Sequence, residues 1–200
     1  LSGVTTNPTL IAESGLDFEE VLEELLHHQE GPVTAQVVSD HVEGMVQQGQ
    51  NLHSMSNRLI IKVPVTKEGL ETIHLLSRQG IPTMATAVFQ PQQGLMAALA
   101  GANFIAPYLG RLEKAGGDPW SMLTKMIQIF RSYKMITKIL AASLHSVDHV
   151  VQCAELGIHG VTLKDTLFDK LIQTDTMTSK AVGKFKSDWQ KVNQVIFSYE

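Results

Sequence analysis

The chain has 200 residues, of which 44% are apolar and 18% are charged, and its formal net charge is −4. This composition is typical of a single globular domain, and the lack of a run of lysines and arginines argues against nucleic acid as the main partner. No apolar run reaches the length that crosses a membrane, and the first residues do not resemble a secretory signal, so we expect no membrane partner. Because the one cysteine, Cys153, cannot form an internal disulfide, we expect a reducing, cytoplasmic compartment and a core position for this residue.

Short β-branched segments alternate with amphipathic helical patterns along the chain. Strands are expected over 2–7, 33–38, 59–66, 82–88, 103–108, 138–143 and 158–163. Each is followed by apolar residues at helical spacing. Ser39 or Asp40, then Asp118 and Ser146, are expected to cap three of these helices at their N-termini.

Strict alternation of strand and helix indicates a parallel sheet. The chain contains seven strand–helix units, whereas a closed (β/α)8 barrel needs eight. We therefore predict an α/β fold, a TIM barrel whose first strand and helix are missing from this sequence, followed by an extra C-terminal helix. An open doubly wound sheet is the alternative, and the lack of a glycine-rich phosphate fingerprint after the first strand weakens its dinucleotide-binding form.

The last helical pattern has no strand after it to cover. Its apolar residues fall close to one stripe, formed by Ala181, Phe185, Trp189, Val192 and Ile196. We predict a barrel domain over 1–174 and a C-terminal helix over 175–200 that packs on a neighbouring subunit. The alternative is that this helix packs on its own domain.

A lysine lies in the middle of the most apolar strand, which runs Leu59-Ile60-Ile61-Lys62-Val63-Pro64-Val65-Thr66. A run of this kind is typical of a strand buried on both faces. Burial lowers the pKa of a lysine, and a neutral amine in a dry pocket can form a Schiff base with a carbonyl. The structural alternative for Lys62 is an ion pair or an amine that reaches solvent at the sheet edge.

Polar residues follow six consecutive strands near their C-terminal ends, where ligands bind in barrel enzymes. These residues are Thr5, Asn7, Gln36, Lys62, Thr86, Tyr108, Arg111 and Ser143. Each is weak evidence by itself, since threonine and asparagine at strand ends are commonly turn or cap residues. Their convergence on one end of the sheet favours a binding or catalytic site there.

These positions carry a resemblance to the small transaldolase family, and most closely to its fructose-6-phosphate aldolase branch. The matching stretches keep the family's order over nearly the whole chain: Gly3-Val4-Thr5-Thr6-Asn7-Pro8, Lys62-Val63-Pro64-Val65-Thr66, Gly69-Leu70, Thr86-Ala87-Val88, Ala106-Pro107-Tyr108 through Arg111, Ala141-Ala142-Ser143 and Asp188-Trp189.

The resemblance implies a TIM-barrel class I aldolase that needs no metal or other cofactor. Lys62 would be the Schiff-base nucleophile, and Gln36, Thr86 and Tyr108 would position the catalytic water. The substrate-binding residues it implies are Thr5 and Asn7 for the donor hydroxyls, Arg111 and Ser143 for the acceptor phosphate, and Ala106. It also implies sugar phosphates as small-molecule partners and a homo-oligomer, a ring of subunits such as a decamer.

Two residues distinguish the aldolase branch of the family from the transaldolase branch. Transaldolases of this family usually carry glutamate where this chain has Gln36, and phenylalanine where it has Tyr108. A tyrosine hydroxyl can hydrogen-bond the water and help to move a proton, which phenylalanine cannot do. We therefore favour formation and cleavage of fructose 6-phosphate with free dihydroxyacetone as the donor. The alternatives are a transaldolase that transfers a dihydroxyacetone unit between sugar phosphates, and a non-catalytic sugar-phosphate-binding or scaffold protein.

The sequence departs from the family at its start and before Thr86. The family has an aspartate near the end of a first strand that is missing here, and we favour a sequence that starts late over a natural barrel with exposed strand edges. Met84 and Ala85 differ from the residues expected at their positions, which would reshape the pocket. A metal site is not expected, since neighbours such as His27 and His28 do not share a helix face.

Overall fold

The structure is a computed structural model, and it describes residues 2–192. Its centre is a parallel sheet of seven strands in the order β1-β2-β3-β4-β5-β6-β7. The strands are β1 (Val4–Thr5), β2 (Val33–Gln36), β3 (Leu59–Pro64), β4 (Thr83–Val88), β5 (Phe104–Pro107), β6 (Lys138–Ala141) and β7 (Gly160–Val161). The edge strands are therefore shorter than the sequence pattern predicts, because only two residues of each pair with a neighbour.

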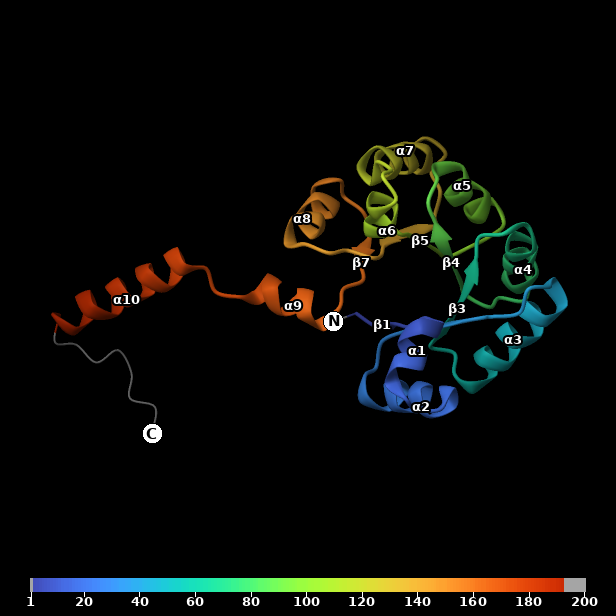
Figure 1. Cartoon of the computed structure of the whole chain (residues 1–200), viewed down its shortest axis with the longest axis horizontal. Helices are drawn as coiled ribbons and strands as arrows, with labels where there is room; N and C mark the ends of the chain where they lie inside the picture. The colour runs from blue at the N-terminus through green and yellow to red at the C-terminus, as the bar shows by residue number, and fades with distance from the viewer. Residues whose placement is uncertain (1, 193–200) are drawn as a thin grey trace. The chain divides into compact units, whose positions relative to one another are not determined.

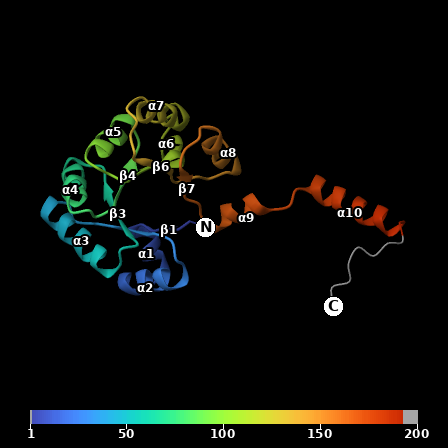
Figure 2. The ribbon, with the colours of Figure 1, turned by 180° about the vertical axis from the view of Figure 1, so that it is seen from behind.

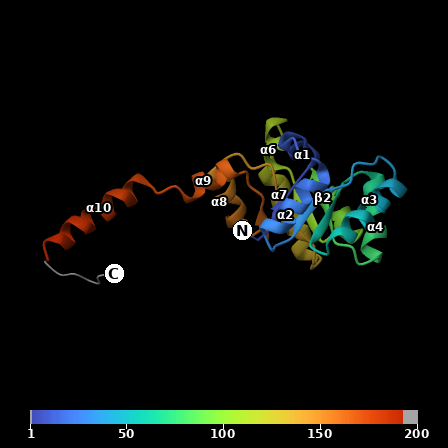
Figure 3. The same cartoon turned by 90° about the horizontal axis from the view of Figure 1, so that it is seen from below.

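Helices cover the outer face of this sheet. These are α2 (Phe18–His28), α3 (Val42–Met55), α4 (Lys67–Arg78), α5 (Pro91–Leu99), α7 (Pro119–Ser132) and α8 (Val147–Glu155). Figure 1 shows the strands inside an arc of helices, and the view from behind in Figure 2 shows the same arrangement. Figure 3 shows that α1 (Pro8–Ser14) and α6 (Leu109–Lys114), which follow β1 and β5, lie instead at one end of the unit.

The sheet curls into a barrel-like shape. Its strands follow one another in chain order, without the reversal of strand order that marks a doubly wound sheet. The curl brings its two ends together, since the side-chain oxygens of Thr5, on β1, and Thr162, just after β7, lie 2.7 Å apart. The predicted α/β TIM-barrel-like fold is thus confirmed over seven strands, and the doubly wound alternative is wrong.

The core has an outer layer between sheet and helices and an inner layer inside the curl. In the outer layer Ile61 of β3 meets α3 and α4, where a Cβ at Gly49 would lie 2.8 Å from Leu76 and 3.4 Å from Ile61. The adjacent residues on β3, Ile60 and Lys62, face the inner layer because side chains alternate along a strand. Cys153 is fully buried, which confirms its predicted core position and raises the pKa of its thiol to about 11.

Two of the three predicted helix caps are confirmed. Asp118 accepts hydrogen bonds from the backbone N–H groups of Trp120 and Ser121, and Ser146 accepts one from His149. The prediction for the third is wrong, because α3 begins after His41, which makes no side-chain cap bond. The polar side chains before it hydrogen-bond one another instead, with Ser39 and His41 in contact.

The chain divides into two compact units, one up to Leu163 and one from Lys164 onward. The second contains α9 (Asp165–Ile172) and α10 (Thr176–Gln190). This grouping places α9 with α10, whereas the predicted domains were 1–174 and 175–200, and that boundary stays a prediction. No residue of α10 is buried, and its apolar side chains Met177, Val182, Phe185 and Trp189 are exposed. Ile196, the last residue of the predicted stripe, lies outside the described residues.

None of the described helices is long and apolar enough to cross a membrane.

Candidate active site

Lys62 lies near the end of β3, inside the curled sheet. Its register partners are Gln36 on β2 and Met84 on β4, so both flank it on the inner face. Only 5% of the residue is exposed, and its amine Nζ donates a hydrogen bond of 2.6 Å to the backbone carbonyl of Thr6. The amine is therefore buried and has a neutral carbonyl as its hydrogen-bond acceptor. A neutral acceptor does not compensate the charge of a buried ammonium group.

Burial and, to a smaller extent, the positive charge of Arg111 together lower the pKa of the Lys62 ammonium from 10.5 to about 8. Both causes act against the charged form, since burial removes water and a like charge repels. A sizeable fraction of the amine is therefore neutral near pH 8. A neutral lysine amine is the form that attacks a carbonyl carbon.

An apolar cluster lies beside Lys62 on the β4 side of the lysine strand. It is the buried cluster of Ile60, Met84, Ala106, Tyr108 and Ala142, against which Phe89, Phe104 and Leu140 pack. Met84 is 2% exposed and stands directly beside Lys62 in the sheet, whereas Ala85, the next residue on the strand, faces the helices. Of the two departures from the family pattern, Met84 is the one that borders the lysine.

Thr86 and Tyr108 form a hydroxyl pair close to the lysine strand. Their side-chain oxygens lie 2.7 Å apart, and both residues are buried. Thr86 stands next to a bulge in the pairing of β4 with β5, and Ala87 has a φ of +57°. Bulges commonly re-aim a side chain next to a functional site, and a positive φ at a residue other than glycine indicates local strain.

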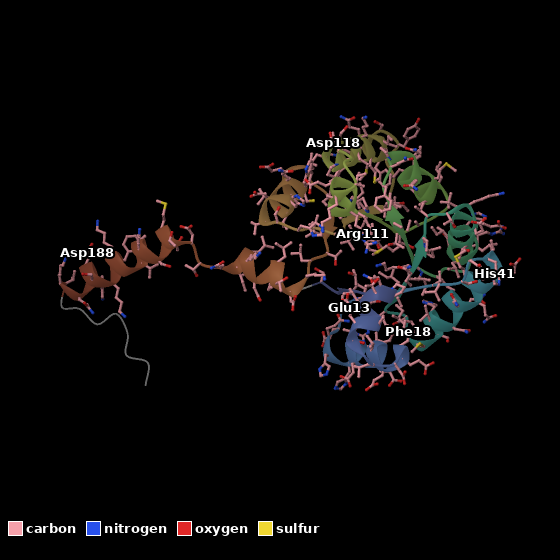
Figure 4. The ribbon with its side chains drawn as sticks, in the orientation of Figure 1. Glu13, Phe18, His41, Arg111, Asp118 and Asp188 are labelled. Atoms are coloured by element: carbon pink, nitrogen blue, oxygen red, sulfur yellow. The ribbon has the colours of Figure 1, made fainter. Side chains whose placement is uncertain are left out.

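Arg111 lies on α6, and its guanidinium carbon is 4.9 Å from the centre of the Tyr108 ring. Figure 4 shows Arg111 inside the arc of outer helices. The residue itself is exposed, so its charge is available to a ligand. A guanidinium group can bind two oxygens of a phosphate at once.

The N-terminal end of α6 is joined to the segment that carries Ser143. The N–H groups of Leu109 and Gly110 donate hydrogen bonds to the carbonyls of Ala142, 3.0 Å, and Ser143, 2.9 Å. Ser143 has a φ of +61°, a second strained position at this end of the sheet. The backbone bond between Gly110 and Ser143 therefore joins the helix that carries Arg111 to the segment that carries Ser143, the two residues expected to bind the acceptor phosphate.

Two predicted donor-binding residues have structural partners. The Thr5 hydroxyl pairs with that of Thr162, and Asn7 accepts a hydrogen bond from the N–H of Leu10, so it is the N-cap of α1. Gln36 is half-buried on β2, and the turn after that strand is held by Gln48, whose side-chain oxygen accepts from two backbone N–H groups. All three predicted residues lie at the C-terminal ends of β1 and β2.

A cavity of about 550 Å³ opens beside these residues, on the side of α1, α2 and α3. Thr6, Asn7 and Gln36 line it together with apolar side chains such as Phe18 and Met55. Lys62 is not among its lining residues, so the hollow adjoins the amine without containing it. Figure 4 shows Phe18 on the helix α2 that borders it.

Three threonines that contact Lys62, Thr5 or Thr6 were not among the residues predicted from the sequence. Thr6 provides the carbonyl that binds Lys62, Thr34 accepts the Thr6 hydroxyl at its own carbonyl, 2.5 Å, and Thr162 pairs with Thr5. Thr34 lies two residues before Gln36 and thus on the same face of β2, which was the available signal. Nothing in the sequence indicates that a backbone carbonyl binds the amine.

Among residues 2–192 no group of three or more histidine, cysteine or carboxylate side chains is placed to hold a metal ion.

The chain is similar to a known protein family and to individual curated proteins. A sequence model of the family described as Transaldolase/Fructose-6-phosphate aldolase matches residues 1–199. A protein of Coprothermobacter proteolyticus named "Probable transaldolase" is 40% identical over 96% of this chain and 88% of its own length. "Probable transaldolase 2" of Listeria monocytogenes is 38% identical over 97% of this chain and 88% of its own length.

Among solved structures, the inosine 5′-monophosphate dehydrogenase of Legionella pneumophila matches with a TM-score of 0.56 at 15% identity. The match covers 84% of this chain and 58% of that one. At this identity it is a likeness of fold alone.

Proposed function

Because this chain belongs to the transaldolase/fructose-6-phosphate aldolase family and is an enzyme of transaldolase type, we propose that it works as a class I aldolase. It forms and cleaves fructose 6-phosphate, with dihydroxyacetone and glyceraldehyde 3-phosphate as the other reactants. The observation that carries the proposal is the buried amine of Lys62, whose pKa is lowered to about 8.

The reaction begins at the lysine. Neutral Lys62 Nζ attacks the ketone carbon of dihydroxyacetone, and the resulting carbinolamine loses water to give an iminium ion. Loss of a proton from the neighbouring carbon gives an enamine, whose carbon forms a bond to the aldehyde carbon of the acceptor. Water then hydrolyses the imine, which releases fructose 6-phosphate and the free amine. Each step reverses in the cleavage direction.

Gln36, Thr86 and Tyr108 hold the water that moves protons in these steps. The hydrogen bond of 2.7 Å between the Thr86 and Tyr108 oxygens supports this role, since it leaves one hydroxyl proton to donate toward a third group. Gln36 supports it by its register position directly opposite Lys62. The positioned hydroxyls supply general acid and base in turn.

The substrate ends are bound on either side of the lysine. Thr5 and Asn7, at the end of β1, bind the donor hydroxyls, and Ala106 lines the site within the inner cluster. Arg111 and Ser143 bind the acceptor phosphate. The backbone bonds that join the start of α6 to the Ser143 segment support this pairing.

Transfer of a dihydroxyacetone unit between sugar phosphates is the second candidate, and the names of the relatives favour it. Tyr108 favours the aldolase reaction over transfer between sugars. Its hydroxyl can donate a proton in the steps that form the iminium ion and the enamine from free dihydroxyacetone. The test compares free dihydroxyacetone with fructose 6-phosphate as the donor, using the same aldehyde acceptors. Product from free dihydroxyacetone is expected, and product from the sugar phosphate donor alone would assign the enzyme to transaldolase instead.

We also propose a cytoplasmic homo-oligomer, a ring of subunits in which the helix over 175–200 packs on a neighbour. The exposed apolar side chains of α10, with none of its residues buried, support such packing.

A further inference from the structure

The helix that carries Arg111 is too short to be stable by itself. α6 has six residues, Leu109–Lys114, and isolated helices of that length do not persist in water. Its position therefore depends on contacts with neighbouring elements. The backbone bonds from Leu109 and Gly110 fix its first turn, and they leave its last turn to be held by other groups.

The last turn of α6 contacts α8 through a glutamate and a histidine side chain. Glu113 Oε2 lies 3.5 Å from His149 Nε2. The His149 side chain is only 12% exposed, and that of Glu113 is 48% exposed. The backbone of His149 is fixed in turn, because its N–H donates to Ser146 Oγ at the N-cap of α8, 3.1 Å.

A third helix holds the His149 ring from the side. The indole of Trp120, at the start of α7, meets the imidazole edge-on, with ring centres 5.3 Å apart. His149 Nδ1 is buried and has no hydrogen-bond partner among the described residues. The ring therefore makes its polar contact at Nε2, toward Glu113, and packing against Trp120 sets its plane.

The geometry of a helix connects this pair to the active site. Successive residues of an α-helix are about 100° apart, so Arg111 and Glu113 point in nearly opposite directions. Arg111 points inward, over the Tyr108 ring, while Glu113 points outward, to His149. The contact of Glu113 with His149 on the outer face of α6 therefore fixes the rotation of the helix about its axis. That rotation sets the direction of the Arg111 guanidinium group.

We propose that Glu113 and His149 are positioning residues that hold α6 in the rotation that aims Arg111 at the acceptor phosphate. They act through Arg111 and touch no substrate. The inference rests on the proposed function in one respect, the role of Arg111 in binding phosphate. It predicts that the pair contributes to selectivity for phosphorylated aldehydes and leaves the Lys62 chemistry untouched.

The test measures kcat and KM with glyceraldehyde 3-phosphate and with unphosphorylated glyceraldehyde, dihydroxyacetone being the donor. Glu113→Ala and His149→Ala are each expected to raise KM for the phosphorylated acceptor about fivefold, which corresponds to about 1 kcal/mol and to the upper range for partly exposed pairs. KM for glyceraldehyde and both kcat values stay unchanged. The double variant is no worse than either single one, and His149→Gln, which keeps an N–H donor, restores part of the effect.

The matched control is Glu24→Ala, which removes a second glutamate–histidine pair, Glu24 with His28 on α2, 2.9 Å apart. It is expected to change neither KM. Amide hydrogen exchange gives a readout of α6 that does not depend on activity. Exchange in the last turn of α6 should become faster in Glu113→Ala and His149→Ala and stay unchanged in Glu24→Ala.

The outcomes separate the two proposals. An equal rise of KM for both aldehydes, or unchanged exchange in α6, overturns the positioning role, even where Arg111→Ala abolishes selectivity for phosphate and so supports the proposed function. If the parent enzyme does not distinguish the two aldehydes, the phosphate role of Arg111 fails, and the exchange rates decide whether the pair holds α6.

Discussion

At the scale of single residues, the proposed chemistry depends on one lysine whose surroundings disfavour its charge. Lys62 is 5% exposed, its amine binds a neutral carbonyl, and its register neighbours on the inner face, Gln36 and Met84, carry no charge. Burial is the larger cause of its lowered pKa, and the charge of Arg111 is the smaller one. The same arginine that we propose as a phosphate ligand thus also favours the neutral amine.

This account predicts the pH dependence of Schiff-base formation. The neutral fraction of Lys62 rises as pH increases through its pKa, so the rate of trapping dihydroxyacetone should rise about tenfold per pH unit below about 8 and level off above it. Arg111→Gln removes a positive charge and should move the profile to higher pH. Lys114→Gln, on the same helix, is the control and should leave it in place.

Tyr108→Phe tests the proton donor. It removes the hydroxyl that lies 2.7 Å from the Thr86 oxygen. Aldol formation from free dihydroxyacetone should fall about a hundredfold, in the range for loss of a general acid, while transfer between sugar phosphates rises. Tyr133→Phe, at an exposed tyrosine, should change neither activity. Full aldolase activity in Tyr108→Phe, with no gain of transfer, would remove the support for the aldolase branch.

At this scale the sequence predicted which side chains are buried or polar, but it did not predict the hydrogen bonds that backbone groups make to them. A lysine in a β-branched strand predicts a buried amine, and the structure buries Lys62. The acceptor of that amine is a main-chain carbonyl, at Thr6, which any residue type provides. Thr162 was overlooked because its partner, Thr5, lies 157 positions away and meets it only when the sheet curls.

At the scale of elements, the long periodic segments were predictable and the short ones were not. The seven strands and their amphipathic helices follow from alternation and helical spacing. α1 and α6 were missed because seven and six residues are too few for a periodic apolar face. Both follow a strand end and lie at the same end of the unit, so the missed elements are those next to the site.

Gly110→Ala tests the close approach of α6 to the segment that follows β6. A Cβ at Gly110 would collide with the carbonyl of Ser143 and the ring of His145. Since backbone cannot yield as a flexible side chain does, we expect α6 to shift, with a loss of about 1–3 kcal/mol in the free energy of unfolding. Denaturant titration measures it, together with KM for the phosphorylated acceptor, which should rise.

The control is Gly183→Ala, on α10, where an added Cβ meets nothing within 4 Å. It should be neutral or slightly stabilising, because alanine has the higher helix propensity. Equal stability of Gly110→Ala and the parent chain would contradict the tight contact.

At the scale of the whole molecule, the chain consists of a curled sheet with its helices and a separate helical unit. The first unit contains every residue proposed for the site. The second exposes apolar side chains on α10, which a monomer rarely leaves in contact with water. The spacing of apolar residues in the sequence predicted the apolar stripe on α10. The surface on which this stripe packs could not be predicted, because no local sequence pattern identifies it.

Phe185→Glu and Trp189→Glu test the proposed subunit packing. Each places a charge among apolar side chains, so burial in an interface becomes unfavourable. The mass in solution, measured by light scattering after size-exclusion chromatography, should fall to that of a smaller assembly. Lys186→Glu, on the same helix, should keep the parent mass. An unchanged mass in both apolar variants would contradict packing through α10.

Lys62 is proposed to form a covalent bond with the donor ketone, and borohydride reduction in the presence of dihydroxyacetone traps that bond. Reduction converts the imine into a stable secondary amine that mass spectrometry can locate. The account predicts an adduct on the peptide that contains Lys62, formed faster at pH 8 than at pH 6 and lost in Lys62→Met. An unmodified Lys62 peptide, or an adduct on another lysine, would contradict it.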